Sequence, residues 1–219
     1  MCNIGISARP EDIGATNTNT WHIPVDAEGD AFGPLCAYFD DPLGTDNQLP
    51  AFITFPSIKD QRFNDKFPEK VSCQMLLMAE YDWFDKYKGD TTTGRKEGYE
   101  ELKEQWKKRC LSIFLRYFPR AEGHIEVCDI STPLSIEHYL GAYRGAAVGL
   151  DVTPERFISP QARQNLDVVT SIEGLYLTGQ DTGVIGVTLA QLSGVTTAFR
   201  ISGFISSAGI LLHSIFGGS

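Results

Sequence analysis

The chain has 219 residues, of which 42% are hydrophobic and 21% are charged, and this ordinary usage predicts one or two globular domains. It excludes disordered and collagen-like proteins. Because 28 acidic residues outnumber 19 basic ones, giving a formal net charge of −9, we expect no nucleic-acid partner.

The cysteines and histidines follow no metal-binding pattern. The chain has five cysteines without a CxxC pair, and its four histidines are scattered. We therefore expect reduced, buried thiols and no structural or catalytic metal.

The first part of the chain predicts a sheet. Runs of alternating, β-branched or aromatic residues bounded by turn residues indicate strands, which we place at residues 2–8, 21–25, 51–55 and 71–78. Their order suits an antiparallel sheet, with a short helix or turn at 32–39.

The clearest single element is an amphipathic helix from Lys96 to Phe118. Apolar residues recur there at steps of three and four among Lys, Glu and Arg, and Pro119 stops the helix. We interpret its aromatic stripe as a face toward the core rather than a cofactor site, and its charged residues as a solvated surface.

The segment after this helix is predicted to hold a strand, a helix start and a loop. Residues 125–130 alternate and indicate a half-buried strand. A helix-start signal follows at Ser131–Ser135, with Glu137 placed as the capping partner. The glycine-spaced segment 141–149 then leads into a proline-bearing loop near 154–160, and such a loop can carry function.

The densest signal for chemistry runs from Gly174 to Gly194. An apolar strand, Leu175–Leu177, precedes a polar, glycine-rich turn that opens a helix of small and apolar residues. A helix N-terminus presents unpaired N–H groups and a positive dipole end to a phosphate or an electron-rich ring edge. Asp181 in the turn either accepts hydrogen bonds from ligand hydroxyls or lies near a helix cap, and the spacing leaves both interpretations open. A complete dinucleotide fold is not predicted, because the sequence has no GxGxxG.

The two ends of the chain are predicted to carry no targeting signal. The N-terminus has neither a secretory pattern nor an Arg-rich amphipathic one. Residues 201–216 are apolar and carry no formal charge, but Ser and Gly interrupt them, which predicts the end of a buried helix and a frayed tail. An interfacial membrane contact is the alternative.

Several motifs, in chain order, resemble one family. The LYLTGQD run at Leu175–Asp181 resembles the C-terminal flavin motif of the FAD-dependent amine-oxidase and phytoene-desaturase superfamily, and within it the retinol saturases and carotenoid isomerases. Further blocks resemble the PSxKD…RFP, YxWF and TPLT…RGxxYG patterns of that family: Pro56–Asp60 with Arg62, Phe63, Phe67 and Pro68; Tyr81–Phe84; and Ser131–Leu134 with Tyr143–Ala146 and Gly149. Together these matches span most of the chain.

The resemblance implies a fold and a division of the chain. Residues 1–150 would form most of a substrate-binding domain, with a mixed or antiparallel sheet and covering helices in an α+β or α/β arrangement. Residues 151–219 would form a linker and the last strand, turn and helix of a Rossmann-like FAD domain. The N-terminal FAD-binding segment with GxGxxG would then be missing from this chain, which we expect to be incomplete and inactive by itself.

The resemblance also assigns site residues. It implies FAD contacts for Thr178, Gly179, Gln180, Asp181, Gly186 and Val187, with Gly179 and Asp181 near the ribityl and pyrophosphate region and the last two near the pyrimidine edge of the flavin ring. It implies that Tyr143, Arg144, Gly145 and Gly149 line the substrate side. The chain departs from the family at Leu189, where a second helix glycine is common, and at Val148, where an aromatic residue is frequent.

Catalytic residues stay unassigned, because no Ser/His/Asp or Cys/His spacing demands a nucleophile. His138 and Tyr139 lie between two of the matched blocks. They are either proton donors or packed or surface residues, and the sequence leaves both interpretations open.

The activity that the resemblance implies is a redox change in a conjugated polyene lipid. Reduction of a C=C bond, as in retinol 13,14-reduction, is the first expectation, with FAD as cofactor and NAD(P)H as an electron donor. Carotenoid cis–trans isomerisation, a non-catalytic remnant that binds an isoprenoid or a partner subunit, and an unstable fragment are alternatives. Peripheral membrane association at the endoplasmic reticulum, or in plastids, follows from the lipid substrate.

Overall fold

The computed structural model describes residues 1–44, 48–89, 94–146, 149–150, 153–182, 185–203 and 209. It divides into two compact units, an N-terminal unit of Met1–Gly145 and a C-terminal unit of Ala146–Ser219. The sequence analysis assigned residues 1–150 to a substrate-binding domain and residues 151–219 to a linker and part of an FAD domain. These two roles stay predictions.

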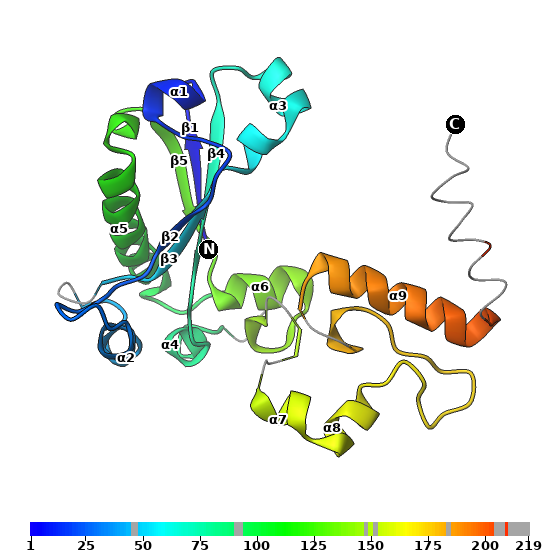
Figure 1. Cartoon of the computed structure of the whole chain (residues 1–219). Helices are drawn as coiled ribbons and strands as arrows, with labels where there is room; N and C mark the ends of the chain where they lie inside the picture. Colours follow the sequence, from blue (N-terminus) through cyan, green and yellow to red (C-terminus); the bar gives the residue numbers. More distant parts are fainter. Residues whose placement is uncertain are drawn as a thin grey trace. The chain divides into compact units, whose positions relative to one another are not determined.

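The N-terminal unit is built on a five-stranded sheet with the strand order β2-β3-β4-β1-β5 (Figure 1). Every neighbouring pair is antiparallel, so the expected antiparallel sheet within an α+β fold is confirmed. The strands are β1 (Cys2–Ile6), β2 (Thr20–His22), β3 (Ala51–Thr54), β4 (Val71–Leu77) and β5 (Ile125–Ile130). The second strand is shorter than predicted, because Pro24 has no N–H to continue a ladder.

Helices and 3-10 turns connect these strands. They are α1 (Pro10–Ile13), α2 (Phe32–Asp40), η1 (Pro56–Lys59), α3 (Gln61–Lys66), α4 (Asp82–Asp85), α5 (Tyr99–Tyr117), η2 (Pro119–Ala121), α6 (Pro133–Leu140) and η3 (Tyr143–Gly145). The long helix predicted from Lys96 is therefore confirmed as α5, and the segment 32–39, expected as a short helix or a turn, is the helix α2.

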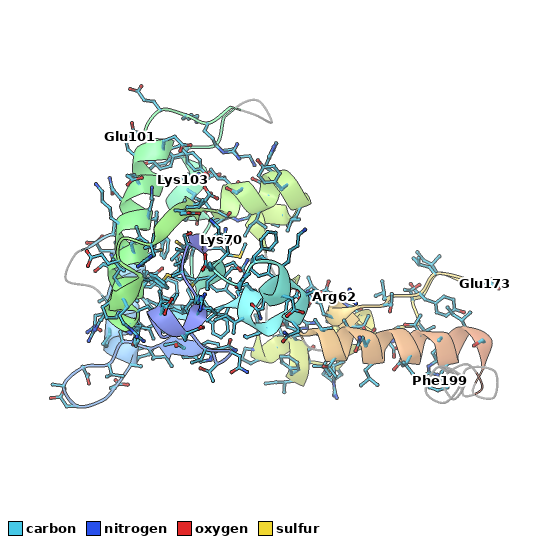
Figure 2. The ribbon with its side chains drawn as sticks, turned by 90° about the horizontal axis from the view of Figure 1, so that it is seen from above. Arg62, Lys70, Glu101, Lys103, Glu173 and Phe199 are labelled. Carbon is cyan, nitrogen blue, oxygen red and sulfur yellow. The ribbon has the colours of Figure 1, made fainter. Side chains whose placement is uncertain are left out.

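The core lies between one sheet face and α5, which runs along the sheet (Figure 1). Alternate strand residues such as Ile4, Ile53 and Met75 are buried there, and α5 contributes Trp106 and Phe114 to the same cluster. The aromatic stripe of the helix is thus a core face, as predicted. Its charged side carries ion pairs, and Lys103, labelled in Figure 2, lies 3.9 Å from Glu100 and 3.4 Å from Asp129.

Strand β5 breaks the alternation that its sequence predicts. The pairing with β1 shifts register between Gly5 and Ile6, so that Ile6 faces Ile125 while Gly5 faces Val127. One extra residue in a strand turns the following side chains to the other face. Val127 is exposed for this reason, while Ile130 is buried.

The start of α6 also differs from the prediction. Thr132 is the N-cap, and it forms a capping box with Ser135. Glu137 was expected in that role, but it lies two residues beyond the box and bonds to Lys88 and Tyr81 instead. A capping box joins the N-cap to the third helical residue, which here is the serine.

The C-terminal unit contains α7 (Pro154–Ile158), α8 (Pro160–Asn165), η4 (Gln180–Thr182) and α9 (Val187–Ser202). The loop expected near 154–160 is therefore two short helices. Each begins with a proline behind a hydroxyl N-cap, Thr153 or Ser159, whose side chain accepts a backbone N–H. Proline fits the first helical position because that N–H needs no partner within the helix.

The strand predicted at Leu175–Leu177 is reduced to a bridge in the described part of the unit. Val169 pairs with Tyr176, and the Leu177 N–H donates to the carbonyl of Val168 at 2.9 Å. A strand needs a continuous partner, and only this short segment lies beside it. The expectation of a regular strand was wrong for the described residues.

Three further expectations concern the cysteines and the tail. All five cysteines are free thiols, but Cys36 is exposed and Cys128 half-buried, so uniform burial was wrong. The apolar run 201–216 falls mostly outside the described residues, as does Val148. Among the described helices, none is long and apolar enough to cross a membrane.

Candidate functional site

Two hydroxyl groups on α9 hold the glycine-rich turn. The Gly179 N–H donates to Ser193 Oγ at 3.0 Å, and Thr197 Oγ1 donates to the carbonyl of Leu177 at 3.0 Å. Both hydroxyl residues are buried, so these bonds replace water that the turn would otherwise bind. The sequence analysis missed Ser193 and Thr197, because it described this helix only as one of small and apolar residues.

Arg156 of α7 also holds this turn. Only 7% of this residue is exposed, and its guanidinium donates to three carbonyls: that of Leu150 at 3.1 Å, that of Gln180 at 3.2 Å and that of Asp181 at 2.9 Å. A guanidinium presents five donors in a fixed fork, which suits several acceptors converging on one point. The sequence analysis missed Arg156, because the three carbonyls converge only in the folded chain.

Asp181 is engaged with the protein. Its Oδ1 accepts the Leu150 N–H at 2.9 Å. Gly149 lies directly against this carboxylate, since a Cβ on that glycine would lie 2.4 Å from Oδ1, and its φ of +78° also favours glycine. The structure therefore brings together Gly149, expected on the substrate side, and Asp181, expected at the cofactor. Asp181 belongs to η4, while the N-cap of α9 is Gly186.

The backbone beside this turn is open. Gly179 and Gly186 have φ values of +102° and +134°, and among the described residues no heavy atom outside the immediate chain neighbours lies within 4 Å of where either Cβ would stand. Thr178 is exposed, Gln180 is half-buried, and Val187, the first residue of α9, is 78% exposed. No side chain in the described part of the chain caps α9, and the first N–H groups of a helix have no partner within the helix.

A cavity of about 540 Å³ lies in the C-terminal unit beside this turn. It is lined by Arg156 and Ser193, which also hold the turn, and by Thr182, whose hydroxyl donates to the carbonyl of Gly179 at 3.0 Å. Leu189, one of the two positions that depart from the family, lines it as well. Arg163 and Arg200 are the other cations among its lining residues, and Asp167 is its acid. The lining thus combines apolar side chains with three arginines and one acid.

The other residues expected on the substrate side belong to the N-terminal unit. Arg144 has a left-handed backbone, with φ of 50°, and its guanidinium pairs with Asp82 and lies 4.7 Å from the ring centroid of Tyr81. A Cβ on Gly145 would lie 2.4 Å from the carbonyl oxygen of Pro133. The turn therefore packs closely on the start of α6, while Tyr143 is 82% exposed.

A polar cluster of three side chains lies next to Arg144. Glu137 accepts from Lys88 Nζ at 2.9 Å and from the Tyr81 hydroxyl at 2.8 Å, and Lys88 Nζ lies 3.2 Å from that hydroxyl. The hydrogen bond from Lys88, and then that from Tyr81, lowers the pKa of Glu137. Burial, and then Glu137, raises the pKa of Tyr81. The cluster keeps a carboxylate charged and a phenol neutral at neutral pH.

His138 and Tyr139 are exposed at the end of α6, with their ring centroids 4.8 Å apart. Neither lines the cavity of about 540 Å³ in the C-terminal unit, and a role as proton donors stays a prediction. No three His, Cys, Asp or Glu side chains in the described part of the chain are grouped so that they could hold a metal ion.

Comparison with known proteins finds relatives of one kind. No protein-family model matches the chain. It is 35% identical over 136 residues to the all-trans-retinol 13,14-reductase of Rattus norvegicus, a match that covers 62% of this chain and 22% of the rat protein. The all-trans-retinol 13,14-reductase of Danio rerio is 29% identical over 193 residues, which are 88% of this chain and 32% of that protein.

A third relative, the inactive all-trans-retinol 13,14-reductase of Danio rerio, is 25% identical over 199 residues, or 90% of this chain and 32% of that protein. The chain thus spans 22–32% of the length of these curated relatives. The identities of 29–35% to the proteins named all-trans-retinol 13,14-reductase, over 62–88% of the chain, support a retinol saturase-like family for this protein.

Proposed function

We propose that the chain is the C-terminal part of an FAD-dependent oxidoreductase that saturates a C=C bond of a conjugated polyene lipid, with all-trans-retinol 13,14-reduction as its reaction. The observation that carries this proposal is the 35% identity to the rat protein of that name. Because the relatives are named as reductases, they support an oxidoreductase. The FAD cofactor, the lipid substrate and the assignment of this chain to one part of a longer enzyme belong to the proposal.

The open backbone of the C-terminal unit supports the flavin. Thr178, Gly179 and Gln180, and the N-terminus of α9 at Gly186 and Val187, would hold it, with Asp181 fixing the turn through Leu150. Glycines without neighbours at the Cβ position allow a flat or phosphorylated group to approach the main chain. When bound, FAD supplies hydride transfer, while the protein supplies orientation and electrostatics.

The rest of the proposed enzyme follows from the same assignment. An FAD-binding segment that this sequence does not include would supply the pyrophosphate loop, and NAD(P)H would serve as electron donor. Tyr143, Arg144, Gly145 and Gly149 would face the substrate. Because retinoids and carotenoids dissolve in membranes, we propose peripheral membrane association at the endoplasmic reticulum, with plastids as the alternative.

The test joins this chain to an upstream strand–GxGxxG–helix segment from its own reading frame and compares two glycine variants. Gly179→Ala should lose bound flavin absorbance and conversion of all-trans-retinol to the dihydro product. Gly174→Ala is the matched control, since Gly174 also has positive φ, at +78°, and open space around its Cβ position. Equal flavin retention in both variants would contradict the assignment, and cis–trans conversion without reduction would favour the isomerase alternative.

A non-catalytic role is the second candidate, and one observation favours it. A relative that is 25% identical over 90% of the chain is named as an inactive reductase. This alternative expects polyene binding without flavin. A joined protein that purifies colourless and binds retinol would support it over the enzyme.

A further inference from the structure

The basic residues of the C-terminal unit all lie at one cavity. Residues 146–219 contain three basic residues and five acidic ones. The three are Arg156, Arg163 and Arg200, and each lines the cavity of about 540 Å³. Asp167 is the only acid among the described lining residues. Three arginines and one aspartate give this lining a formal charge of +2, in a chain whose net charge is −9.

Two of these cations have no partner in the part of the chain that the structure describes. Neither the Arg163 guanidinium on α8 nor the Arg200 guanidinium on α9 forms a hydrogen bond or an ion pair there. Arg156 differs, because its guanidinium donates to the carbonyls that fix the turn. Asp167 does not neutralise the pair, since its Oδ1 accepts the Val169 N–H at 3.2 Å. Two cationic side chains at the cavity are therefore available to a bound anion.

The rest of the cavity is mostly apolar. Its apolar lining residues come from α7, from the segment after α8 and from α9, and they are Phe157, Leu166, Val168, Leu189 and Leu192. Phe157, Leu189 and Leu192 are exposed. Large apolar side chains that gather at an exposed hollow mark a surface that another group covers. The volume lies within the range of roughly 300–1,000 Å³ that is typical of small-molecule sites.

This combination selects a ligand with two different ends. A guanidinium binds a carboxylate or a phosphate through two parallel hydrogen bonds, and it is more weakly hydrated than an ammonium group. A wholly apolar ligand would leave the two arginines without a counter-charge. A small inorganic anion would leave the apolar side chains in water, and thus without the gain that burial of apolar surface provides.

We infer that this cavity binds an anionic amphiphile, which is a hydrocarbon chain with one carboxylate or phosphate head, and that the head lies at Arg163 and Arg200. Such a ligand is charged, unlike the neutral polyene of the proposed reaction. Because the cavity lies within the C-terminal unit and needs no flavin, binding can be measured on the 219-residue chain by itself.

Isothermal titration calorimetry with dodecanoate tests the ligand class. Dodecanoate should bind at one site, and its affinity should fall as salt is added, because salt screens exposed charges. Dodecanol has the same chain with a neutral head, and acetate has the same head without the chain. Each should bind at least about tenfold more weakly than dodecanoate. A parallel titration with dodecyl phosphate identifies which head group binds more tightly.

Single arginine variants test the position of the head. Arg163→Gln and Arg200→Gln should each weaken dodecanoate binding about fivefold or more, because each removes hydrogen bonds to a charged group. The control comes from the N-terminal unit, since every basic residue of 146–219 lines the cavity. Arg62, labelled in Figure 2, is exposed, and its guanidinium has no partner among the described residues. Arg62→Gln should keep the affinity within about twofold of the parent chain.

A second pair of variants tests the position of the hydrocarbon chain. Trp21, Phe52 and Leu76 stand in register across β2, β3 and β4 and form another apolar surface, in the N-terminal unit. Leu192→Ser should weaken dodecanoate binding about fivefold, because it removes apolar surface from the cavity. Leu76→Ser should leave the affinity within about twofold of the parent chain. The reverse result would place the ligand on the sheet and overturn the inference.

Other results would overturn it as well. They are the absence of saturable binding, equal affinity for dodecanoate and dodecanol, and equal affinity for dodecanoate and acetate, which would mean an adventitious ion only. Displacement of dodecanoate by FAD would assign the cavity to the cofactor. Loss of dodecanoate binding in the protein joined to its upstream segment would mean that this segment covers the cavity.

The two proposals fail separately. If dodecanoate does not bind but Gly179→Ala loses flavin in the joined protein, the proposed function stands. If the joined protein binds dodecanoate but no flavin, only the flavin assignment is rejected.

Discussion

The two units of this protein hold themselves together by different means. In the N-terminal unit, one sheet face and α5 enclose a cluster that includes Ile53, Met75 and Phe114 with almost no exposure. In the C-terminal unit, the buried side chains in the described part are mostly polar, and they are Arg156, Ser193, Thr197 and the apolar Val168. Large apolar side chains there, such as Ile172, Leu192 and Ile201, are exposed.

This difference shows which interactions stabilise each unit. Apolar burial is non-directional, and it tolerates small shifts as long as volume is filled. Hydrogen bonds from side chains to a turn fix its backbone at defined points, and a missing donor leaves a buried carbonyl unpaired. The N-terminal unit therefore depends on packing, while the turn expected to hold flavin depends on a few polar atoms (Figure 2, where Phe199 marks α9).

The largest expected effect is a loss of stability on truncating an apolar side chain, which should be large in the N-terminal unit and small in the C-terminal unit. Phe114→Ala should lower the free energy of unfolding of the N-terminal unit by about 3–5 kcal/mol, because this fully buried ring contacts Phe55 and Phe118 and leaves a cavity. Leu192→Ala in the C-terminal unit should change stability by about 0.5 kcal/mol or less, since that side chain is exposed. Urea unfolding followed by circular dichroism measures both, and equal effects would break the comparison.

The next effect tests the polar attachment of the turn. Arg156→Met should destabilise the turn by about 2–3 kcal/mol, because it removes the donor to three carbonyls at once. Hydrogen–deuterium exchange should rise at residues 149–150 and 179–182, while the N-terminal unit keeps its unfolding midpoint. Arg163→Met, at an exposed arginine of the same unit, is the control and should leave exchange unchanged. Unchanged protection in Arg156→Met would show that packing holds the turn.

A smaller effect belongs to the hydroxyls of α9. Ser193→Ala removes the acceptor of the Gly179 N–H, and Thr197→Val removes the donor to Leu177, each at a cost of about 1 kcal/mol. Exchange at the Gly179 amide should rise in Ser193→Ala. Thr196→Val is the matched variant, because the exposed Thr196 hydroxyl bonds within α9, to the carbonyl of Leu192, and to no other group among the described residues. If Thr196→Val has the same effect, helix propensity rather than turn contact explains the loss.

The smallest effect concerns pH in the N-terminal unit. The pKa of Glu137 is below its ordinary value of 4.5 in the folded chain, so its contribution is present above pH 4.5 and is lost as pH falls through the folded-state pKa. Glu137→Gln should lower the thermal midpoint at neutral pH, and its difference from the parent chain should shrink at acidic pH. Differential scanning fluorimetry across this range measures it.

Glu126→Gln provides the comparison for that pH effect. The pKa of Glu126 is lowered mainly by its hydrogen bond to Lys70, at 2.8 Å, on an exposed part of β5 (Figure 2 labels Lys70). It should change the midpoint less than Glu137→Gln, because Glu137 bonds two partners and joins α6 to the segment that follows β4. A pH-independent difference for Glu137→Gln would show that the effect comes from lost packing.

The sequence by itself determined the elements whose burial repeats along the chain. Periodicity located β1, β3, β4 and α5 and their core faces, because alternation and 3.6-residue repeats record which side of a local element is buried. The motifs also led to the retinol saturase-like family, which the relatives support. In the C-terminal unit, the sequence located the glycine-rich turn and the helix that follows it.

The tertiary structure alone decided which atoms meet across long separations. It placed Gly149 against Asp181, converged three carbonyls on Arg156, and gave Glu137 partners other than a cap. It also introduced the β5 bulge that exposes Val127 and aligned Trp21, Phe52 and Leu76 across three strands. Local patterns record burial, but register and side-chain contacts depend on segments far apart in the chain, which no window of sequence contains.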